Sequence, residues 1–183
     1  LFNAQIGMNA VDSEANKIFL AKGENELPGK GFYPADLTKE EFHTILLKMI
    51  KDGEIQEVKN ILNQRSMVVR DGQKLKGIDY TEYFAKEFSY IADELEAAAE
   101  VSTNEDFNKY LKLQAIALCE NNPKNDAYAD KKWAELQDTP LEFTISREQY
   151  ADEMTGTVVE NEELNKLLEE NGIEPISKDS IGI

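Results

Sequence analysis

The sequence predicts an α+β protein that is predominantly helical, with one β-hairpin and one later short strand. Three observations lead to this class. Apolar residues recur every three to four positions over most of the chain, as in amphipathic helices. An Asp71-Gly72 pair separates two short apolar segments, which is the pattern of a tight hairpin. Residues 141–145 alternate strictly between apolar and polar side chains, as in a strand with one buried face.

The first half of the chain is expected to contain a loop and two helices. Residues 1–22 have weak apolar periodicity and read as a helix or an irregular segment, and a Gly- and Pro-rich loop follows up to residue 31. Thr38 and Glu41 have the spacing of a capping box, in which each side chain bonds the other's free backbone N–H. A helix is therefore expected over residues 38–52, with Gly53 at its end, and a shorter one over residues 55–62.

The hairpin is expected over residues 67–75, where Asp71-Gly72 supplies the positive φ angles of a two-residue turn. From Asp79 to about Ala99 the spacing becomes strongly helical, with an aromatic stripe along one face that is expected to be core.

Three further helices are expected. Ser102 and Glu105 form a second possible capping box, which opens a helix that ends at the Asn121-Asn122-Pro123 sequence. A shorter helix follows that carries Tyr128, Trp133 and Leu136. An acidic helix over residues 160–171 closes at Asn171-Gly172. The chain is divided on this basis into residues 1–31, residues 32–156 and residues 157–183, the last with a truncated end.

The composition excludes several classes of function. With 20 basic and 36 acidic side chains in 183 residues, the net charge is −16, so the surface repels phosphate and no nucleic-acid partner is expected. No apolar run approaches the ~20 residues that span a bilayer. One cysteine, Cys119, and one histidine, His43, exclude an internal disulfide and any Cys-based or two-histidine zinc motif within this chain.

Individual reactive residues have ordinary explanations. His43 is expected to be a surface residue beside acidic neighbours, and Cys119 a small buried hydrophobe on its helix. Adjacent carboxylates such as Glu40 and Glu41 are expected on solvated helix faces, because 36 acids supply such pairs by chance. By motifs alone, the residues do not indicate a reaction.

Three segments taken in order resemble a known family. They are residues 27–42 (LPGKGFYPADLTKEEF), the FNKYL sequence that begins at Phe107, and residues 130–156, which include DTPLEFTI and EQYADEMTG. Their order and spacing resemble the N-terminal part of bacterial proteins of the dipeptidyl-peptidase III family of zinc metallopeptidases. The resemblance covers roughly residues 27–156 and implies one lobe of a two-lobed peptidase-like architecture.

The resemblance implies two substrate-binding residues and no catalytic or metal-binding residue in this chain. In the family, a strand near the active-site cleft leads into a Glu-x-Tyr segment, which Glu148 and Tyr150 match. A carboxylate can pair with a free α-ammonium, and a phenol can donate to a developing oxyanion. The family's His-Glu-x-x-Gly-His-type helix, which holds zinc, lies downstream of the matched segments, so zinc is implied only for a complete family member.

The sequence departs from the family pattern on both sides of Tyr150. Ser146-Arg147 stand where a Gly-Pro-aromatic stretch is expected, and residues 157–160 (TVVE) replace a Lys-Ala-aromatic-Glu continuation.

The leading functional hypothesis is a non-catalytic N-terminal lobe that contributes to the peptide-binding cleft of such a peptidase. The alternative is a stand-alone acidic module that binds peptides or proteins without enzymatic activity. The expected partners are a peptide substrate or the missing catalytic half, and the chain is expected to be part of a longer polypeptide.

Overall fold

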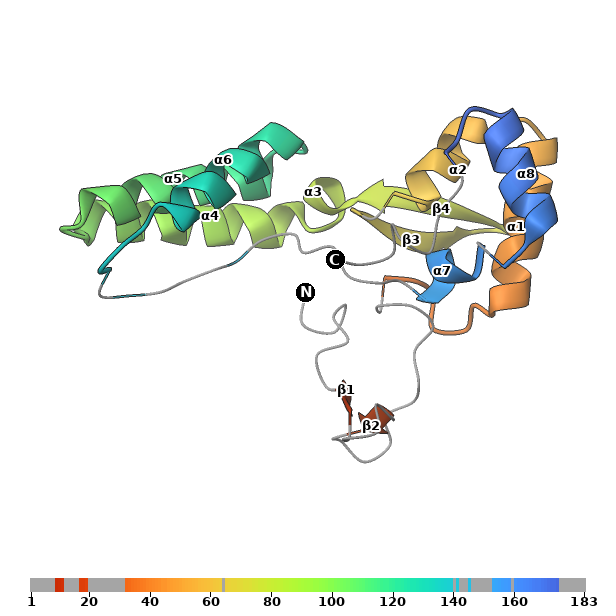
Figure 1. Ribbon diagram of the computed structural model, residues 1–183, viewed down its shortest axis with the longest axis horizontal. Coiled ribbons are helices and arrows are strands. Elements are labelled where there is room, and N and C mark those ends of the chain that lie inside the picture. The colour runs from red at the N-terminus through yellow and green to blue at the C-terminus, as the bar shows by residue number, and fades with distance from the viewer. Residues whose placement is uncertain are drawn as a thin grey trace. The chain divides into compact units, whose positions relative to one another are not determined.

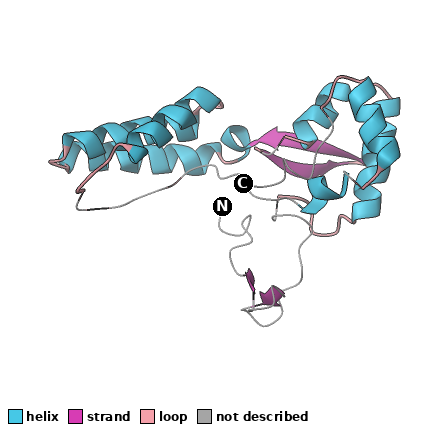
Figure 2. Ribbon diagram, in the orientation of Figure 1, coloured by secondary structure: helices cyan, strands magenta, loops and turns pink. Residues whose placement is uncertain are grey.

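The computed structural model describes residues 9–11, 17–19, 32–63, 65–139, 141, 145, 153–158 and 160–174. In these ranges the chain has eight helices and two antiparallel strand pairs, so the α+β, mainly helical class is confirmed (Figures 1 and 2). The chain forms two compact units, one of residues 1–78 and 149–183 and one of residues 79–148. The division at residues 31 and 156 stays a prediction.

The first unit is organised around α1 (Lys39–Lys51). Each end of this helix is capped by residues that are close to it in sequence. Thr38 Oγ1 accepts a 3.1 Å hydrogen bond from the backbone N–H of Glu41, as the capping box requires. At the other end, Gly53 has a φ of +81°, and the N–H groups of Gly53 and Glu54 bond the carbonyls of Ile50 and Met49. This Schellman arrangement satisfies carbonyls that the helix leaves free, and glycine adopts its left-handed angle without strain.

The helix α2 (Ile55–Ile61) packs against a hairpin of β3 (Ser66–Asp71) and β4 (Lys74–Asp79). The hairpin is where the sequence predicts it, but its turn lies one residue later than expected. Asp71 still belongs to β3, and the loop is Gly72-Gln73, with Gly72 alone at a positive φ of +62°. A two-residue turn with glycine first needs only that one positive angle.

The C-terminal part of the chain returns to this unit as α7 (Glu153–Val158) and α8 (Glu162–Glu170). Figure 1 shows α8 alongside α1, and the two helices are in contact. The predicted acidic helix is confirmed as α8, and Gly172, at a φ of +68°, ends it with a second Schellman arrangement. The core joins all these elements. Its buried members are Leu37, Phe42, Leu46, Met49, Ile50, Val58, Ile61, Val68, Leu75, Met154, Val158, Leu164 and Leu168.

A second strand pair lies near the N-terminus. The strands β1 (Asn9–Val11) and β2 (Lys17–Phe19) pair antiparallel, with Ala10 opposite Ile18. The expectation of a helix or irregular segment is therefore wrong for these six residues. Short strands leave few periodic positions from which to recognise them, and β-branched residues such as Val11 and Ile18 favour a strand.

The second unit begins with α3 (Tyr80–Tyr83) and α4 (Ala85–Val101), where the sequence suggests one continuous helix. The Asp79 side chain caps α3 through a 2.8 Å bond from the N–H of Thr81. The aromatic stripe is core, as expected: Tyr80, Phe84 and Phe88 are 6% exposed each, and the Phe84 and Phe88 rings lie 5.8 Å apart. Tyr83 is the exception, because it is 45% exposed.

The helix α5 (Glu105–Cys119) lies between α4 and α6 (Pro123–Ala134), which flank it (Figure 1). The helix is predicted correctly, but its cap is not the Ser102-Glu105 box. Asn104 Oδ1 accepts from the N–H groups of Asp106 and Phe107, at 3.1 and 3.0 Å, while Ser102 ends α4. Asparagine is at least as good an N-cap as serine, so the nearer asparagine determines where the helix begins.

The shorter predicted helix is present as α6, which carries Tyr128 and Trp133 but ends before Leu136. Asn122 caps it, Pro123 occupies its first turn, and Leu136 lies beyond its end. In the predicted strand of residues 141–145, only Leu141 and Ile145 are described, and both have irregular backbone. The prediction of a strand is therefore not met at these two residues.

Candidate functional site

The two residues predicted to bind substrate, Glu148 and Tyr150, lie outside the described residues. The described residue that precedes them in the chain is Ile145, and its backbone carbonyl is held by a side chain of α5. The amide Nε2 of Gln114 donates a hydrogen bond to that carbonyl. The second unit therefore anchors the backbone three positions before Glu148.

Gln114 is a buried polar residue on an otherwise apolar helix face. Its side chain is 3% exposed, and it shares its face with Phe107, Leu111 and Leu118, at spacings of three and four residues. A buried amide needs partners, and the Ile145 carbonyl supplies one. We did not single out this residue from the sequence. A lone glutamine within a helical apolar stripe is the signal that would have indicated it.

A second polar cluster joins β3 to the start of α1. The guanidinium of Arg70 donates two parallel bonds to the Glu41 carboxylate, at 2.8 and 2.9 Å, and reaches Asp36 Oδ2 at 2.9 Å. Hydrogen bonds from Arg70 lower the pKa of both carboxyl groups below their ordinary values. The sequence predicts a solvated Glu41, but its carboxylate is bound by Arg70, which lies 29 positions later.

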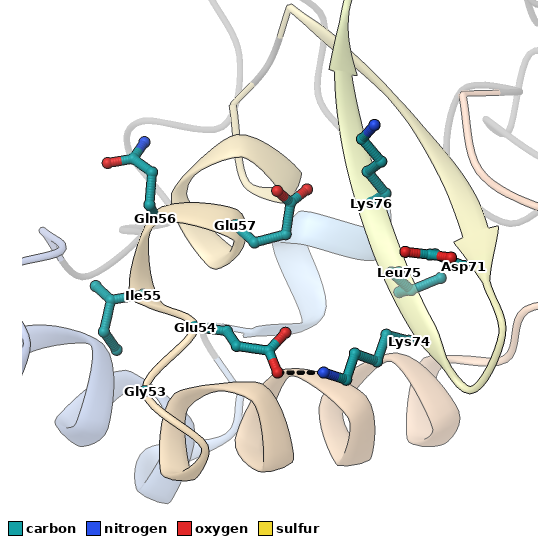
Figure 3. Close-up of a pocket in the computed structure, with 9 residues that line it drawn as sticks. All are labelled: Gly53, Glu54, Ile55, Gln56, Glu57, Asp71, Lys74, Leu75 and Lys76. Carbon is teal, nitrogen blue, oxygen red and sulfur yellow. Dashed lines mark hydrogen bonds and ion pairs between the residues drawn. The ribbon is translucent and has the colours of Figure 1, made fainter.

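The described residues also form a surface hollow of about 490 Å³ between the α1–α2 turn and the hairpin (Figure 3). In Figure 3, Glu54 and Lys74 point toward one another across it and form an ion pair, which raises the pKa of Lys74. Glu57, on its wall, accepts a 2.7 Å bond from the N–H of Gly77. These three side chains are engaged with one another or with the backbone, and Asp71 and Lys76 also line the hollow.

Two residues differ from their expected surroundings. His43 is half-buried rather than on the surface, because Thr157 and Asn161 pack against its ring. Cys119 is exposed rather than buried, and it is the last residue of α5. Its thiol reaches the carbonyl of Phe88 at 3.9 Å.

Within the described ranges, no three His, Cys, Asp or Glu side chains are grouped so that they could hold a metal ion. Among the same residues, no helix is both long and apolar enough to cross a membrane.

Comparison with known proteins gives matches only among solved structures. No protein-family model and no curated protein sequence matches the chain. A structure of DPP III from Caldithrix abyssi is 29% identical in sequence, with a TM-score of 0.52, and the match covers 70% of this chain and 23% of that one. A structure of dipeptidyl-peptidase III from Corallococcus sp. strain EGB is 22% identical over 66% of this chain and 22% of that one, with a TM-score of 0.48.

This chain thus spans less than a quarter of the Caldithrix protein. The resemblance indicated by the sequence motifs is confirmed, and the chain has the fold of one part of a dipeptidyl-peptidase III.

Proposed function

We propose that this chain forms the non-catalytic N-terminal lobe of a dipeptidyl-peptidase III-like zinc metallopeptidase and contributes to its peptide-binding cleft. The likeness to DPP III from Caldithrix abyssi, at 29% identity over 70% of the chain, is the observation that carries the proposal. The part matched is 23% of that protein. In this proposal, the zinc-binding half belongs to the remainder of a complete enzyme.

In this proposal, Glu148 and Tyr150 bind the reacting end of the peptide. The Glu148 carboxylate pairs with the free α-ammonium of the substrate peptide. This ion pair determines which peptide bond of the substrate is cut. The Tyr150 phenol donates a hydrogen bond to the scissile carbonyl as negative charge develops on its oxygen. The Gln114 amide holds the carbonyl of Ile145, three positions before Glu148. Zinc, when bound by the complete enzyme, supplies the activated water.

The test compares this chain alone with the product of its complete open reading frame. The complete product is expected to release dipeptides from peptides with a free N-terminus and not from N-acetylated ones, because acetylation removes the α-ammonium. The chain alone is expected to be inactive and to bind no zinc tightly. Peptidase turnover by the chain alone, with one zinc per chain by plasma mass spectrometry, would contradict the proposal.

A stand-alone binding module is the second candidate, and the net charge of −16 favours it. An acidic surface attracts Lys- and Arg-rich peptides, with an affinity that falls as salt rises. An open reading frame that ends near codon 183, together with salt-dependent binding of a basic peptide by the chain, would support this module over the peptidase lobe. A frame that continues into a His-Glu-x-x-Gly-His-type helix would support the lobe.

A further inference from the structure

His43 lies on α1 where α7 and α8 return to it, and it contacts both. Its Nε2 is 2.8 Å from the hydroxyl oxygen of Thr157, at the end of α7. Its Nδ1 is 3.4 Å from the amide nitrogen of Asn161, the N-cap of α8. The histidine is the only one in the chain. It therefore links three elements of the first unit through both ring nitrogens.

The partners of the ring determine where its proton lies. The Thr157 hydroxyl donates to the carbonyl of Met154 at 2.7 Å, so its oxygen is left to accept from Nε2–H. The Oδ1 of Asn161 accepts from the N–H of Leu164 at 3.0 Å as the α8 cap, so its NH₂ group faces Nδ1. Both contacts require the same neutral tautomer, with the proton on Nε2 and a lone pair on Nδ1.

Among the described residues, the group within hydrogen-bond distance of Nδ1 is the amide nitrogen of Asn161, which does not accept a hydrogen bond from a second ring proton. The new N–H points at the NH₂ group of Asn161, and two donors repel each other. Turning the Asn161 amide over would present Oδ1 to the ring, but the NH₂ group would then face the N–H of Leu164 and the cap would be lost. Protonation of Nδ1 therefore breaks either the His43–Asn161 contact or the hydrogen bond that caps α8.

Burial and nearby charged side chains also affect the protonation equilibrium of His43. Burial lowers the pKa of His43 and outweighs Glu40 on α1 and Glu160 before α8, whose charges raise it. Residues 154–158 of α7 have no titratable side chain, and Glu163 of α8 lies 3.3 Å from Lys51. The neutral ring is thus favoured in the folded state for reasons besides its hydrogen bonds.

We propose that neutral His43 is a latch that holds α7 and α8 on α1, and that protonation of its Nδ1 loosens the first turn of α8, so that this unit contains a pH-sensitive switch. The inference does not depend on the proposed function. Leu164 and Leu168 of α8 are fully buried in the core, so the effect begins at the capped end of the helix and not along its whole length.

The single histidine makes the switch directly measurable by NMR. In the ¹⁵N-labelled chain, the imidazole signals at about pH 8 are expected to show the Nε2–H tautomer, with a midpoint below the ordinary value of 6.5. The protection of the Leu164 amide, which is the intrinsic exchange rate divided by the observed rate at each pH, is expected to fall as the ring is protonated, because its acceptor is Asn161 Oδ1. An Nδ1–H tautomer, or protection of that amide that stays constant through the titration, would overturn the proposal.

The variant Asn161→Asp tests the sign of the coupling. Aspartate caps a helix as well as asparagine does, but it places an acceptor opposite Nδ1. The pKa of His43 is expected to rise above its ordinary value, and acidification through the imidazole range is expected to stabilise the variant while it destabilises the unchanged chain. Asn104→Asp makes the same change at the α5 cap and serves as the control, expected to leave the His43 titration unchanged. If His43 titrates with the same midpoint pH in Asn161→Asp and in Asn104→Asp, the proposed latch is refuted.

A variant that cannot titrate completes the test. His43→Gln keeps a side-chain N–H donor and cannot take up a proton in this range. Its melting temperature is expected to fall less than that of the unchanged chain between about pH 8 and pH 5, because the linkage to imidazole protonation is gone. If the melting temperatures of His43→Gln and the unchanged chain fall by the same amount over this pH range, the result would contradict the switch. This holds even if the variant is less stable at every pH.

Discussion

The backbone N–H of Gly77 on β4 donates a 2.7 Å hydrogen bond to Oε1 of Glu57 on α2. This bond is possible because the strand lies directly against the helix backbone. A Cβ atom at residue 77 would lie 2.4 Å from the carbonyl carbon of Asn60 and 2.6 Å from the nitrogen of Ile61. The contact explains why a glycine stands inside a strand, where it is otherwise unfavourable.

Gly77→Ala is therefore expected to destabilise the chain by about 1 to 3 kcal/mol, because backbone atoms must move apart to accept one methyl group. Chemical denaturation monitored by circular dichroism measures this change. Lys76→Ala, at the exposed neighbouring position, is the control and is expected to stay within about 0.5 kcal/mol. Equal stability of the two variants would mean that α2 and β4 are farther apart than described.

Arg70 makes stability depend on pH through Asp36 and Glu41. Their pKa values are lowered in the folded state from ordinary values of 3.8 and 4.5, chiefly by hydrogen bonds from Arg70. The folded state then binds fewer protons than the unfolded one, so this stabilisation is present above the ordinary values and is lost as the pH falls through the lowered ones.

Arg70→Gln is expected to remove that dependence. Between about pH 5 and pH 3, its unfolding free energy should fall less steeply than that of the unchanged chain. Urea titrations at several pH values give the two slopes. Lys39→Gln, an exposed position at the start of α1, removes the same charge and is expected to keep the original slope. Parallel slopes for Arg70→Gln and the unchanged chain would show that the ion pairs are too weakly formed in solution to matter.

Gln114→Met is expected to remove the donor to the Ile145 carbonyl while keeping nearly the same side-chain volume. The chain should lose about 1 to 3 kcal/mol if that carbonyl is left without a partner. Thermal unfolding measures the loss. Lys112→Met, two residues earlier on the exposed side of α5, provides the control for introducing a methionine. A Gln114 variant as stable as this control would indicate that water replaces the amide.

Tyr150→Phe, made in the complete enzyme, is expected to lower kcat by about 100-fold with little change in KM, because a phenol that donates to an oxyanion acts mainly in the transition state. Dipeptide release under saturating substrate measures it. Tyr128→Phe, on α6 and 58% exposed, removes the same hydroxyl elsewhere and is expected to have no effect. An unchanged kcat for Tyr150→Phe would reject its assignment to the substrate site.

The local features of the fold could be predicted because they depend on residues close in sequence. Thr38 and Glu41 are three positions apart and form one turn, so their spacing alone indicated where α1 begins. Competition between neighbouring caps was harder to judge. Asn104 and Ser102 are both good N-cap residues, and the nearer Asn104 accepts the N–H bonds of Asp106 and Phe107 while Ser102 ends α4.

The short N-terminal strands were missed for a related reason. Three residues each in β1 and β2 carry too few alternating positions to be distinguished from an irregular segment, and their pairing joins residues six to ten positions apart. The assignment of Glu148 and Tyr150 rests on family motifs and stays a prediction, since both lie outside the described residues.

The sequence by itself predicted most of the helical segments, although not α7 and not the break between α3 and α4, and it indicated which family the ordered motifs resemble. Periodicity, capping and motif order are properties of neighbouring residues. Only the tertiary structure decided that Glu41 binds Arg70, that Gln114 holds Ile145 and that His43 lies between Thr157 and Asn161. Each of these contacts joins residues at least 29 positions apart, and the partner of a polar side chain at such a separation is selected by how the helices pack.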